Sequence, residues 1–479
     1  MTLDLPRAVV LVDGEHYPPV VAAALEGLRR RYDVVAGLFA GGREKLRGGE
    51  GEALELLAAE LGLPRLDRVD PDGAAAHEVL EGARAALRAA RAEALVDLSD
   101  EPVVGYRERF LLMSAALAEG ARYVAADTEV RPQDFARLER LPALGVIGTG
   151  KRVGKTAVSG WLARRLDAAL RERGGVIVLA MGRGGPPEPE LVPGREGLGA
   201  ADLLAASRRG LHAASDCYED AVLAGVPTVG CRRCGGGLAG APFDDTVRAA
   251  LPLLEESAAA LAVIEGSGSV VPPVACDAAV CVSSAAQPAE YVAGLLGTYR
   301  LLLSDVLVLT QCEAPFADAA RVRELTEAAL AVRPGLRVVP AVFRPRPAQP
   351  VRGRRVAFFT TAPDDAVPRL AHALAEDHGA EVVLVSAALA DRGRLAGDVA
   401  RAAREADVFL CEIKAAAVDV VAEAADAAGR ELVFCDNEPV AAEGGAPDDL
   451  GEAVDEAAGL AAERFAARRA AAAPAGARP

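Results

Sequence analysis

The residues best suited to chemistry lie in a glycine-rich stretch near position 150. It runs VIGTGKRVGKTAVSG from Val146 to Gly160. A phosphate-binding loop follows the template G-x-x-x-x-G-K-[ST], in which backbone N–H groups surround phosphates, the lysine reaches the outer phosphates and the hydroxyl binds Mg²⁺. Gly154, Lys155 and Thr156 fit the end of this template, but its first glycine position is occupied by Thr149. The stretch therefore predicts a phosphate-binding loop with unusual spacing, although a glycine-rich turn with chance basic residues is the alternative.

Lysine usage supports the same interpretation. The chain contains 53 Lys and Arg residues, nearly all of them Arg, and two of the few lysines, Lys151 and Lys155, lie in this stretch. A compact, strongly hydrated ammonium differs chemically from a planar guanidinium. The use of lysine in a chain that otherwise uses arginine therefore indicates that the ammonium has a specific role at these two positions. We predict that Lys151, Arg152 and Lys155 take part in catalysis. The residues predicted to contact a nucleotide are Gly148, Thr149, Gly150, Val153, Gly154, Thr156 and Ala157.

An acidic residue follows another predicted strand. The apolar run Leu261 to Ile264 ends in Glu265-Gly266-Ser267-Gly268. Carboxylate oxygens are ligands that Mg²⁺ prefers, and parallel sheets bind ligands at the carboxyl ends of their strands. We predict that Thr156 and Glu265 hold Mg²⁺. The alternative is that Glu265 caps the following turn.

Arginines recur in three segments rich in glycine or proline. Arg183 lies in AMGRGGPPEPE, Arg232 and Arg233 lie in the predicted glycine-rich turn GVPTVGCRRCGGGLAG, and Arg344 and Arg346 lie between prolines in VFRPRPAQP. Guanidinium groups bind phosphate oxygens in a bidentate manner, so we predict that these residues bind an anionic substrate, with Arg183 also catalytic. A solvated linker is the alternative for the proline segment, and a metal site is the alternative for the C-x-x-C in the turn.

Two further polar segments leave their roles open. HAASDCYEDA places His212 and Asp216 on one predicted helix face, which suits contacts to phosphate or Mg²⁺ as well as an ordinary polar surface. His212 is retained as a substrate-binding candidate. DGEHYPP, with Asp13 and His16, follows a predicted strand and indicates either a second binding face or a structural turn.

The elements that must position these residues alternate between short apolar strands and Ala/Leu-rich helices. This pattern predicts an α/β protein made of three consecutive units with mostly parallel sheets, the central one of the P-loop NTPase type. In that unit we expect strands at 144–147, 176–181, 260–265 and 305–310, and a helix at 156–170. The predicted boundaries are 1–141, 142–350 and 351–465, followed by a frayed low-complexity tail at 466–479.

Composition limits the class of protein. The chain has 479 residues, 51% of them apolar, and a formal net charge of −16, which argues against a broad nucleic-acid-binding surface. No apolar run approaches the roughly 18 residues of a membrane span, and the eight cysteines do not indicate a disulfide scaffold. We expect a cytoplasmic protein that binds neither nucleic acid nor membrane. We also expect the protein to be a homodimer.

Several blocks of the sequence together identify a family. The spacing G-T-x-x-x-x-G-K-T resembles the loop of the dethiobiotin synthetase group. The blocks LVDGEHYPPV, GTGKRVGKTA, MGRGGP, HAASD, GVPTVGCRRCGGG, VFRPRP and FCDNEP resemble the cyclic 2,3-diphosphoglycerate synthetase family over the whole chain. The resemblance implies a cytoplasmic enzyme that converts 2,3-bisphosphoglycerate and ATP to cyclic 2,3-diphosphoglycerate, ADP and phosphate, with Mg²⁺ as cofactor. Another P-loop ligase or ring-forming enzyme and a nucleotide switch protein are the alternative functions.

Overall fold

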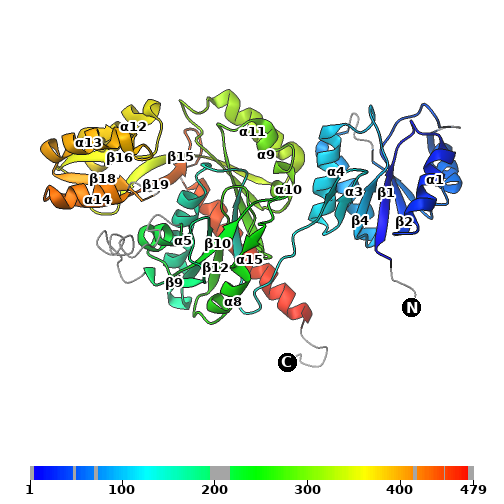
Figure 1. Cartoon of the computed structure of the whole chain (residues 1–479), viewed down its shortest axis with the longest axis horizontal. Coiled ribbons are helices and arrows are strands. Elements are labelled where there is room, and N and C mark those ends of the chain that lie inside the picture. Colours follow the sequence, from blue (N-terminus) through cyan, green and yellow to red (C-terminus); the bar gives the residue numbers. More distant parts are fainter. Residues whose placement is uncertain are drawn as a thin grey trace. The chain divides into compact units, whose positions relative to one another are not determined.

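The chain forms two compact units in the computed structural model (Figure 1). The structure describes residues 5–46, 50–69, 74–194, 216–413, 418–446 and 448–472. The first unit, called here the N-terminal unit, consists of Met1–Asp134, Gln287–Ser304 and Arg323–Leu336. The second, called the main unit, consists of Phe135–Ala286, Asp305–Val322 and Arg337–Pro479.

The N-terminal unit is built on a six-stranded sheet in the order β3-β2-β1-β4-β5-β6. All neighbouring strands are parallel except β5 and β6. Val10 on β1, with Leu25 and Leu57 from two helices, is buried in one core cluster. The elements are β1 (Arg7–Val12), α1 (Pro18–Leu28), β2 (Asp33–Phe39), α2 (Glu50–Glu60), β3 (Leu66–Arg68), α3 (Ala76–Ala90), β4 (Ala94–Asp97), α4 (Tyr106–Ala118), β5 (Arg122–Val124), β6 (Glu129–Val130), α9 (Ala289–Val292), α10 (Gly297–Leu302) and most of α11 (Ala319–Val332).

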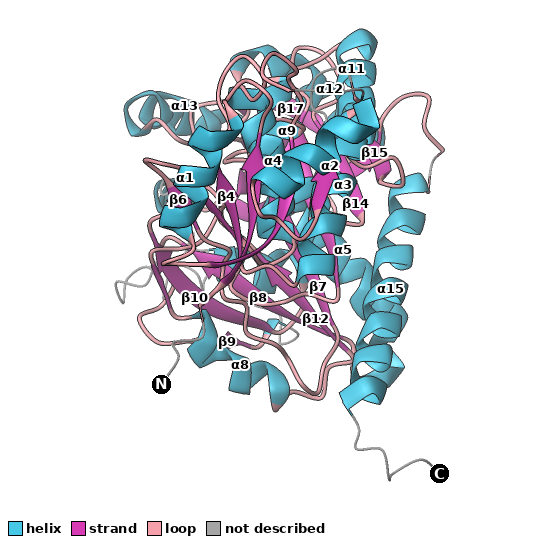
Figure 2. Ribbon diagram, turned by 90° about the vertical axis from the view of Figure 1, so that its right-hand side faces the viewer, coloured by secondary structure: helices cyan, strands magenta, loops and turns pink. Residues whose placement is uncertain are grey.

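The main unit contains one large mixed sheet. Its first part is parallel from β10 to β14 in the order β10-β8-β12-β7-β13-β14. Strands β8, β12 and β7 are neighbours in this order (Figure 2), and α5 packs against one face of them. The elements are β7 (Ala143–Gly148), α5 (Lys155–Leu170), β8 (Val176–Gly182), β9 (Glu190–Val192), α7 (Asp216–Glu219), β10 (Thr228–Cys234), β11 (Asp244–Asp245), α8 (Val247–Glu255), β12 (Leu261–Glu265), β13 (Ala278–Ser284) and β14 (Val306–Thr310).

The remainder of the sheet is built by the C-terminal third of the chain. The order continues β14-β15-β19-β18-β16-β17, so the second and third predicted α/β units share one sheet (Figure 1). The elements are β15 (Arg337–Pro347), β16 (Arg355–Phe359), α12 (Val367–His378), β17 (Glu381–Ser386), α13 (Arg392–Glu405), β18 (Val408–Glu412), α14 (Val418–Ala427), β19 (Glu431–Ala441) and α15 (Asp449–Ala472).

Strand β15 joins the two parts because it changes partner along its length. Residues 337–340 pair in parallel with β14, and residues 341–347 pair in antiparallel fashion with β19. Proline has no N–H to donate and is confined to strand positions where none is needed. Pro345 and Pro347 lie in the half that pairs only with β19. The proline segment is therefore the end of a strand, and our interpretation of it as a possible linker is wrong.

Alternating side chains cover the two faces of the sheet around β7. Val178 on β8 and Val263 on β12 pack with Leu162 of α5 on one face. Leu179 and Ile264, each one residue further along, pack with Leu254 of α8 on the other face. Strand side chains alternate between faces with a period of two, so both faces of these buried strands need apolar residues.

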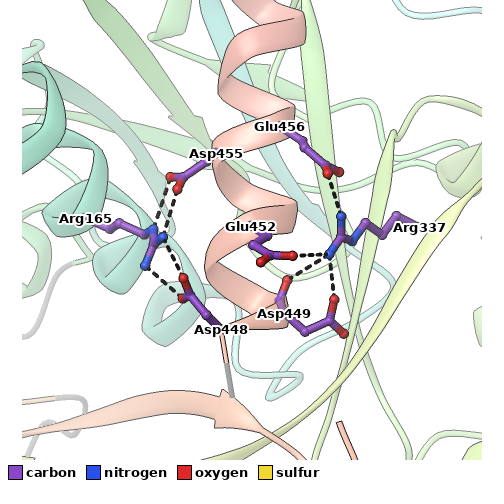
Figure 3. Close-up of polar contacts among 7 residues, drawn as sticks. All are labelled: Arg165, Arg337, Asp448, Asp449, Glu452, Asp455 and Glu456. Carbon is purple, nitrogen blue, oxygen red and sulfur yellow. Dashed lines mark hydrogen bonds and ion pairs between the residues drawn. The ribbon is translucent and has the colours of Figure 1, made fainter. Parts of the chain in front are cut away.

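Helix α15 completes the first of these faces. Leu450, Val454 and Ala461 belong to the same core cluster as Leu162. Two arginines flank the helix (Figure 3): Arg165 of α5 pairs with Asp448 and Asp455, and Arg337 of β15 pairs with Asp449, Glu452 and Glu456. The helix continues to Ala472, into the region predicted as a frayed tail, because alanine and arginine have high helix propensity. The helices in the described part of the chain include none with the length and apolar character of a membrane span.

Candidate active site

The glycine-rich stretch connects β7 to α5, as the sequence predicts. Gly154 takes the left-handed backbone conformation at φ 85°, and α5 begins at the next residue, Lys155. The first turn of a helix has N–H groups without intrahelical partners, which favour an anion at that end. The strand, turn and helix thus have the architecture of a phosphate-binding loop.

The two lysines of the loop have different surroundings. Lys155 is only 7% exposed, and a Cβ atom added to Gly148 would lie 3.0 Å from its Cδ, so its aliphatic stem lies against the start of the loop. Lys151 and Arg152 are exposed, and Arg152 has a positive φ of 63°. Lys155 is therefore preorganised by packing, whereas Lys151 and Arg152 are presented to solvent.

Glu265 lies one strand away from the loop. It is the last residue of β12, which pairs with β7 on one side and β8 on the other, and it is 2% exposed. The next residue, Gly266, donates its N–H to the carbonyl oxygen of Val146 at 2.9 Å. The carboxyl ends of parallel strands meet at one edge of a sheet, so Glu265 and the loop lie at the same edge.

Two predicted arginines approach the turn that follows Glu265. A Cβ atom added to Gly268 would lie 3.4 Å from Nη2 of Arg183 and 3.4 Å from Nη2 of Arg233. Arg183 follows β8 and is exposed, whereas Arg233 is 8% exposed. Arg233 donates to the carbonyl oxygens of Gly235 at 2.7 Å and Ser267 at 2.8 Å. Two guanidinium groups therefore converge at Gly268, in the turn that follows Glu265, and one of them also holds that turn in place.

The segment of Arg232 and Arg233 differs from its predicted conformation. Both residues lie in β10, not in a glycine-rich turn, and alternation along this strand exposes Arg232 and buries Arg233. The same alternation buries Cys231 and exposes Cys234. Burial raises the pKa of Cys231 to about 12. The C-x-x-C pair thus points to opposite faces of a strand, a geometry unsuited to a shared metal ion.

The arginines of β15 already have acidic partners. Arg344 forms a bidentate ion pair with Glu313, with Nη–Oε distances of 2.7 and 2.9 Å, and Arg369 binds the same carboxylate at 2.5 Å. Burial favours a higher pKa for Glu313, but the hydrogen bonds from the two arginines outweigh it and leave the pKa below its ordinary value. Sequence analysis missed this pairing because Glu313 and Arg344 lie 31 residues apart and on different elements.

Arg346 has acidic partners as well. Its Nη2 lies 3.5 Å from Asp436, and its Nε lies 3.1 Å from Glu438. Arg164 of α5 binds Asp436 at 3.0 Å, so this cluster joins the helix after the loop to the C-terminal third of the sheet. Arg344 and Arg346 thus carry intramolecular ion pairs, and their predicted contact with substrate stays a prediction. His212 lies outside the described residues.

The N-terminal unit has a polar cluster of its own. Asp13, at the end of β1, is 2% exposed and accepts hydrogen bonds from Nδ1 of His16 at 2.9 Å and from the backbone N–H of Asp100 at 2.7 Å. Asp97, at the end of the neighbouring β4, accepts from Nε of Arg109 at 3.1 Å. Asp13 thus holds the loop after β1 through His16 and the loop after β4 through Asp100, which supports the structural interpretation of DGEHYPP.

The residues at the loop suit a nucleotide phosphate and a magnesium ion by their donor chemistry. A Cβ atom on Gly154 would overlap the ring of Phe343, and one on Gly148 would be tightly packed at 3.0 Å from Cδ of Lys155, so glycine suits both positions of this turn. Mg²⁺ is usually bound by one or two protein oxygens together with substrate phosphates and water, and Thr156 and Glu265 offer such oxygens. No group of three His, Cys, Asp or Glu side chains among the described residues forms a metal site.

Taken with the sheet order, this loop defines an α/β protein with a P-loop nucleotide-binding domain. Comparison with protein families matches three models in sequence: the N-terminal domain of cyclic 2,3-diphosphoglycerate synthetase at residues 7–131, its P-loop domain at 143–342 and its C-terminal domain at 347–438. The chain therefore belongs to the cyclic 2,3-diphosphoglycerate synthetase family.

Individual relatives agree along most of the chain. The cyclic 2,3-diphosphoglycerate synthetase of Rubrobacter xylanophilus is 51% identical over 438 residues, which cover 91% of this chain and 94% of the relative. That of Methanothermus fervidus is 39% identical over 438 residues, covering 91% and 93%. Among solved structures, the hydrogenase maturation factor HypB from Archaeoglobus fulgidus aligns with a TM-score of 0.27 and 14% identity over 43% of this chain and 82% of its own. The relatives are named synthetases, which supports an enzyme.

Proposed function

We propose that this protein is an ATP- and Mg²⁺-dependent ligase that closes the intramolecular pyrophosphate of 2,3-bisphosphoglycerate, giving cyclic 2,3-diphosphoglycerate, ADP and phosphate. The observation that carries the proposal is the whole-chain match to synthetases of that name, 51% identical in one case. The convergence of Arg183 and Arg233 at Gly268, in the turn after Glu265, supports it, because a substrate with two phosphates needs positive charge next to the nucleotide site.

The reaction proceeds in two transfers in this proposal. First, an oxygen of one substrate phosphate attacks the γ-phosphorus of ATP; a P–O bond forms and the bond to ADP breaks. Then an oxygen of the other substrate phosphate attacks the phosphorus of the first, closing the ring and releasing inorganic phosphate. Phosphate oxygens are ionised near neutral pH, so the chain needs no strong general base. Catalysis rests on positioning and charge stabilisation.

The residues divide these tasks. Lys155 bridges the β and γ phosphates, and the exposed Lys151 and Arg152 follow the phosphoryl group as it moves. Thr156 and Glu265 would hold Mg²⁺, which when bound would neutralise charge on the phosphate oxygens. Arg183 and Arg232 are exposed at the carboxyl edge of the sheet and are the first candidates to bind the substrate phosphates. Arg233, Arg344 and Arg346 follow them, because each already makes hydrogen bonds or ion pairs within the chain.

The test is ³¹P NMR of the purified full chain with Mg²⁺, ATP and 2,3-bisphosphoglycerate. We expect signals of ADP, phosphate and a new upfield pyrophosphate resonance, and none of these with Lys155→Ala. Arg183→Ala is expected to raise the barrier by about 3 kcal/mol, as for other preorganised charge-stabilising donors. Arg173→Ala, an exposed arginine after α5, is the matched control and keeps full activity. ATP hydrolysis with unchanged 2,3-bisphosphoglycerate would instead favour a different ligase or a nucleotide switch.

The assembly and location of the enzyme belong to the same proposal. We expect a homodimer in the cytoplasm, which suits a multidomain enzyme acting on small metabolites. Light scattering of the eluting full chain would give the mass directly, compared with 49.3 kDa for one chain.

A further inference from the structure

The first residue of interest is Thr149, the position at which the loop departs from the usual template. Its side chain is almost fully buried, at 6% exposure of the residue. Its Oγ1 lies 2.8 Å from Oγ of Ser283, and its backbone N–H donates to the carbonyl oxygen of Val282 at 3.2 Å. The beginning of the phosphate-binding loop is thus fastened to the end of the neighbouring strand β13.

The end of the loop is fastened in a similar manner from the next strand. Thr310, the last residue of β14, is fully buried. Its hydroxyl lies 2.8 Å from the carbonyl oxygen of Val153 and 3.1 Å from that of Ser283. A hydroxyl has a single proton to donate, and the nearer acceptor is Val153, immediately before Gly154. Thr310 therefore holds the carbonyl from which the loop turns into α5.

We propose that Ser283 and Thr310 are positioning residues that set the shape of the phosphate-binding loop before the nucleotide arrives. The loop needs such support because Arg152 and Gly154 both have positive φ, at 63° and 85°. Such conformations persist only where the surroundings hold them. Its backbone N–H groups bind phosphate only if they point inward together.

The hydrogen bonds of Ser283 and Thr310 are buried, which strengthens their hold on the loop. Inside a protein, a hydrogen bond is electrostatically stronger than in water, and removing one partner leaves the other without compensation. Replacing Thr310 by valine keeps the volume and the branched shape but leaves the buried carbonyl of Val153 without this donor. The loop then relaxes toward conformations in which its N–H groups no longer converge.

This inference rests on nucleotide binding by the loop and is independent of which acid the enzyme uses as substrate. The decisive measurement is therefore calorimetric titration of the full chain with ATP or ADP in the absence of 2,3-bisphosphoglycerate. Thr310→Val is expected to raise Kd about tenfold, which corresponds to about 1.4 kcal/mol. Thr310→Ser, which keeps the hydroxyl, is expected to bind within about twofold of the wild type.

Thr228→Val is the matched control. Thr228 is also fully buried, lies at the start of β10, and donates to the carbonyl oxygen of Val226 at 3.1 Å. A general loss of stability would affect both valine variants, whereas a positioning role changes nucleotide affinity only in Thr310→Val. Ser283→Ala removes the partner of Thr149 and is the second variant if Thr310→Val does not fold.

The outcomes separate clearly. Weaker nucleotide binding in Thr310→Val or Ser283→Ala, restored in Thr310→Ser and absent in Thr228→Val, supports the inference. Wild-type affinity in both Thr310→Val and Ser283→Ala overturns it, as does an equal loss in Thr228→Val. A wild-type chain that binds ATP but forms no cyclic product would remove the proposed reaction and leave this inference standing.

Discussion

The phenyl ring of Phe343 on β15 occupies the space beside Gly154: a Cβ atom added to Gly154 would lie 2.2 Å from Cζ of that ring. Gly154 also has φ 85°, where residues with a Cβ are strained. Two independent features therefore favour glycine at position 154: the positive φ of its backbone, and the ring of Phe343, which fills the space that a Cβ atom would take.

This relationship predicts that Gly154→Ala weakens nucleotide binding by about a hundredfold or more, because the loop must move to avoid the ring. Calorimetry with ATP measures the effect. In Gly154→Ala/Phe343→Ala the clash is relieved but the positive φ remains, so we expect only partial recovery. Gly353→Ala is the control for backbone strain alone, since Gly353 has φ 69° and open space around it; it should leave nucleotide binding unchanged. Full binding by Gly154→Ala would contradict the assignment of the loop.

The positions of the loop and of the strands around it were predictable from the sequence because their signals are local. Glycine, lysine and threonine at a strand-to-helix turn carry their own geometry, and β7, β8, β12 and β14 match the expected strands within one residue at each end. The place of Glu265 at the end of a strand was predicted because it follows an apolar run and precedes a glycine. These features depend on neighbours in sequence, which periodicity and motif spacing describe.

The features that the sequence could not reveal depend on distant partners. The strand β15 contains prolines that argue against a strand, and only its pairing with β19 explains them. The ion pairs of Arg344 and Arg346 were hidden for the same reason, so these arginines seemed free to clamp a substrate. Nor could composition show that α15 packs on the sheet around β7. In each of these cases, contacts with residues distant in the sequence determine the structure.

The pair of arginines around Glu313 predicts a pH dependence of stability. The pKa of Glu313 is lower in the folded chain than its ordinary value of 4.5, so its contribution to stability is present above about pH 4.5 and is lost as the pH falls through the folded pKa. Glu313→Gln cannot titrate. Urea unfolding of the wild type and of Glu313→Gln measures the difference in their free energies of unfolding. This difference should be constant from about pH 5.5 to about 7.5, where Glu313 stays ionised, and should shrink below about pH 4.5. A difference that persisted at lower pH would contradict the ion pair.

The two cysteines of β10 should differ in reactivity. Burial raises the pKa of Cys231 to about 12, and hydrogen bonding to Thr246 only partly opposes this, whereas Cys234 is exposed. The thiolate is the reactive form, so iodoacetamide at pH 8 should label Cys234 and leave Cys231 unmodified until urea unfolds the chain. Peptide mass spectrometry measures both sites. Equal labelling of the two in the folded chain, or protection of both by added Zn²⁺, would contradict their opposite orientation.

Substitutions in helix α15 can compare how much apolar packing and surface ion pairs each contribute to stability. Leu450 is 2% exposed within the core around β7, so Leu450→Ala should lower the free energy of unfolding of the main unit by about 2–5 kcal/mol. Asp455 pairs with Arg165 at 2.8 Å, but their side chains are 48% and 31% exposed (Figure 3). Partly exposed pairs contribute little, so Asp455→Asn should cost less than about 1 kcal/mol. Urea unfolding of the two variants side by side measures both values. If Asp455→Asn proved as damaging as Leu450→Ala, the ion pairs rather than the apolar face would hold the helix on the sheet.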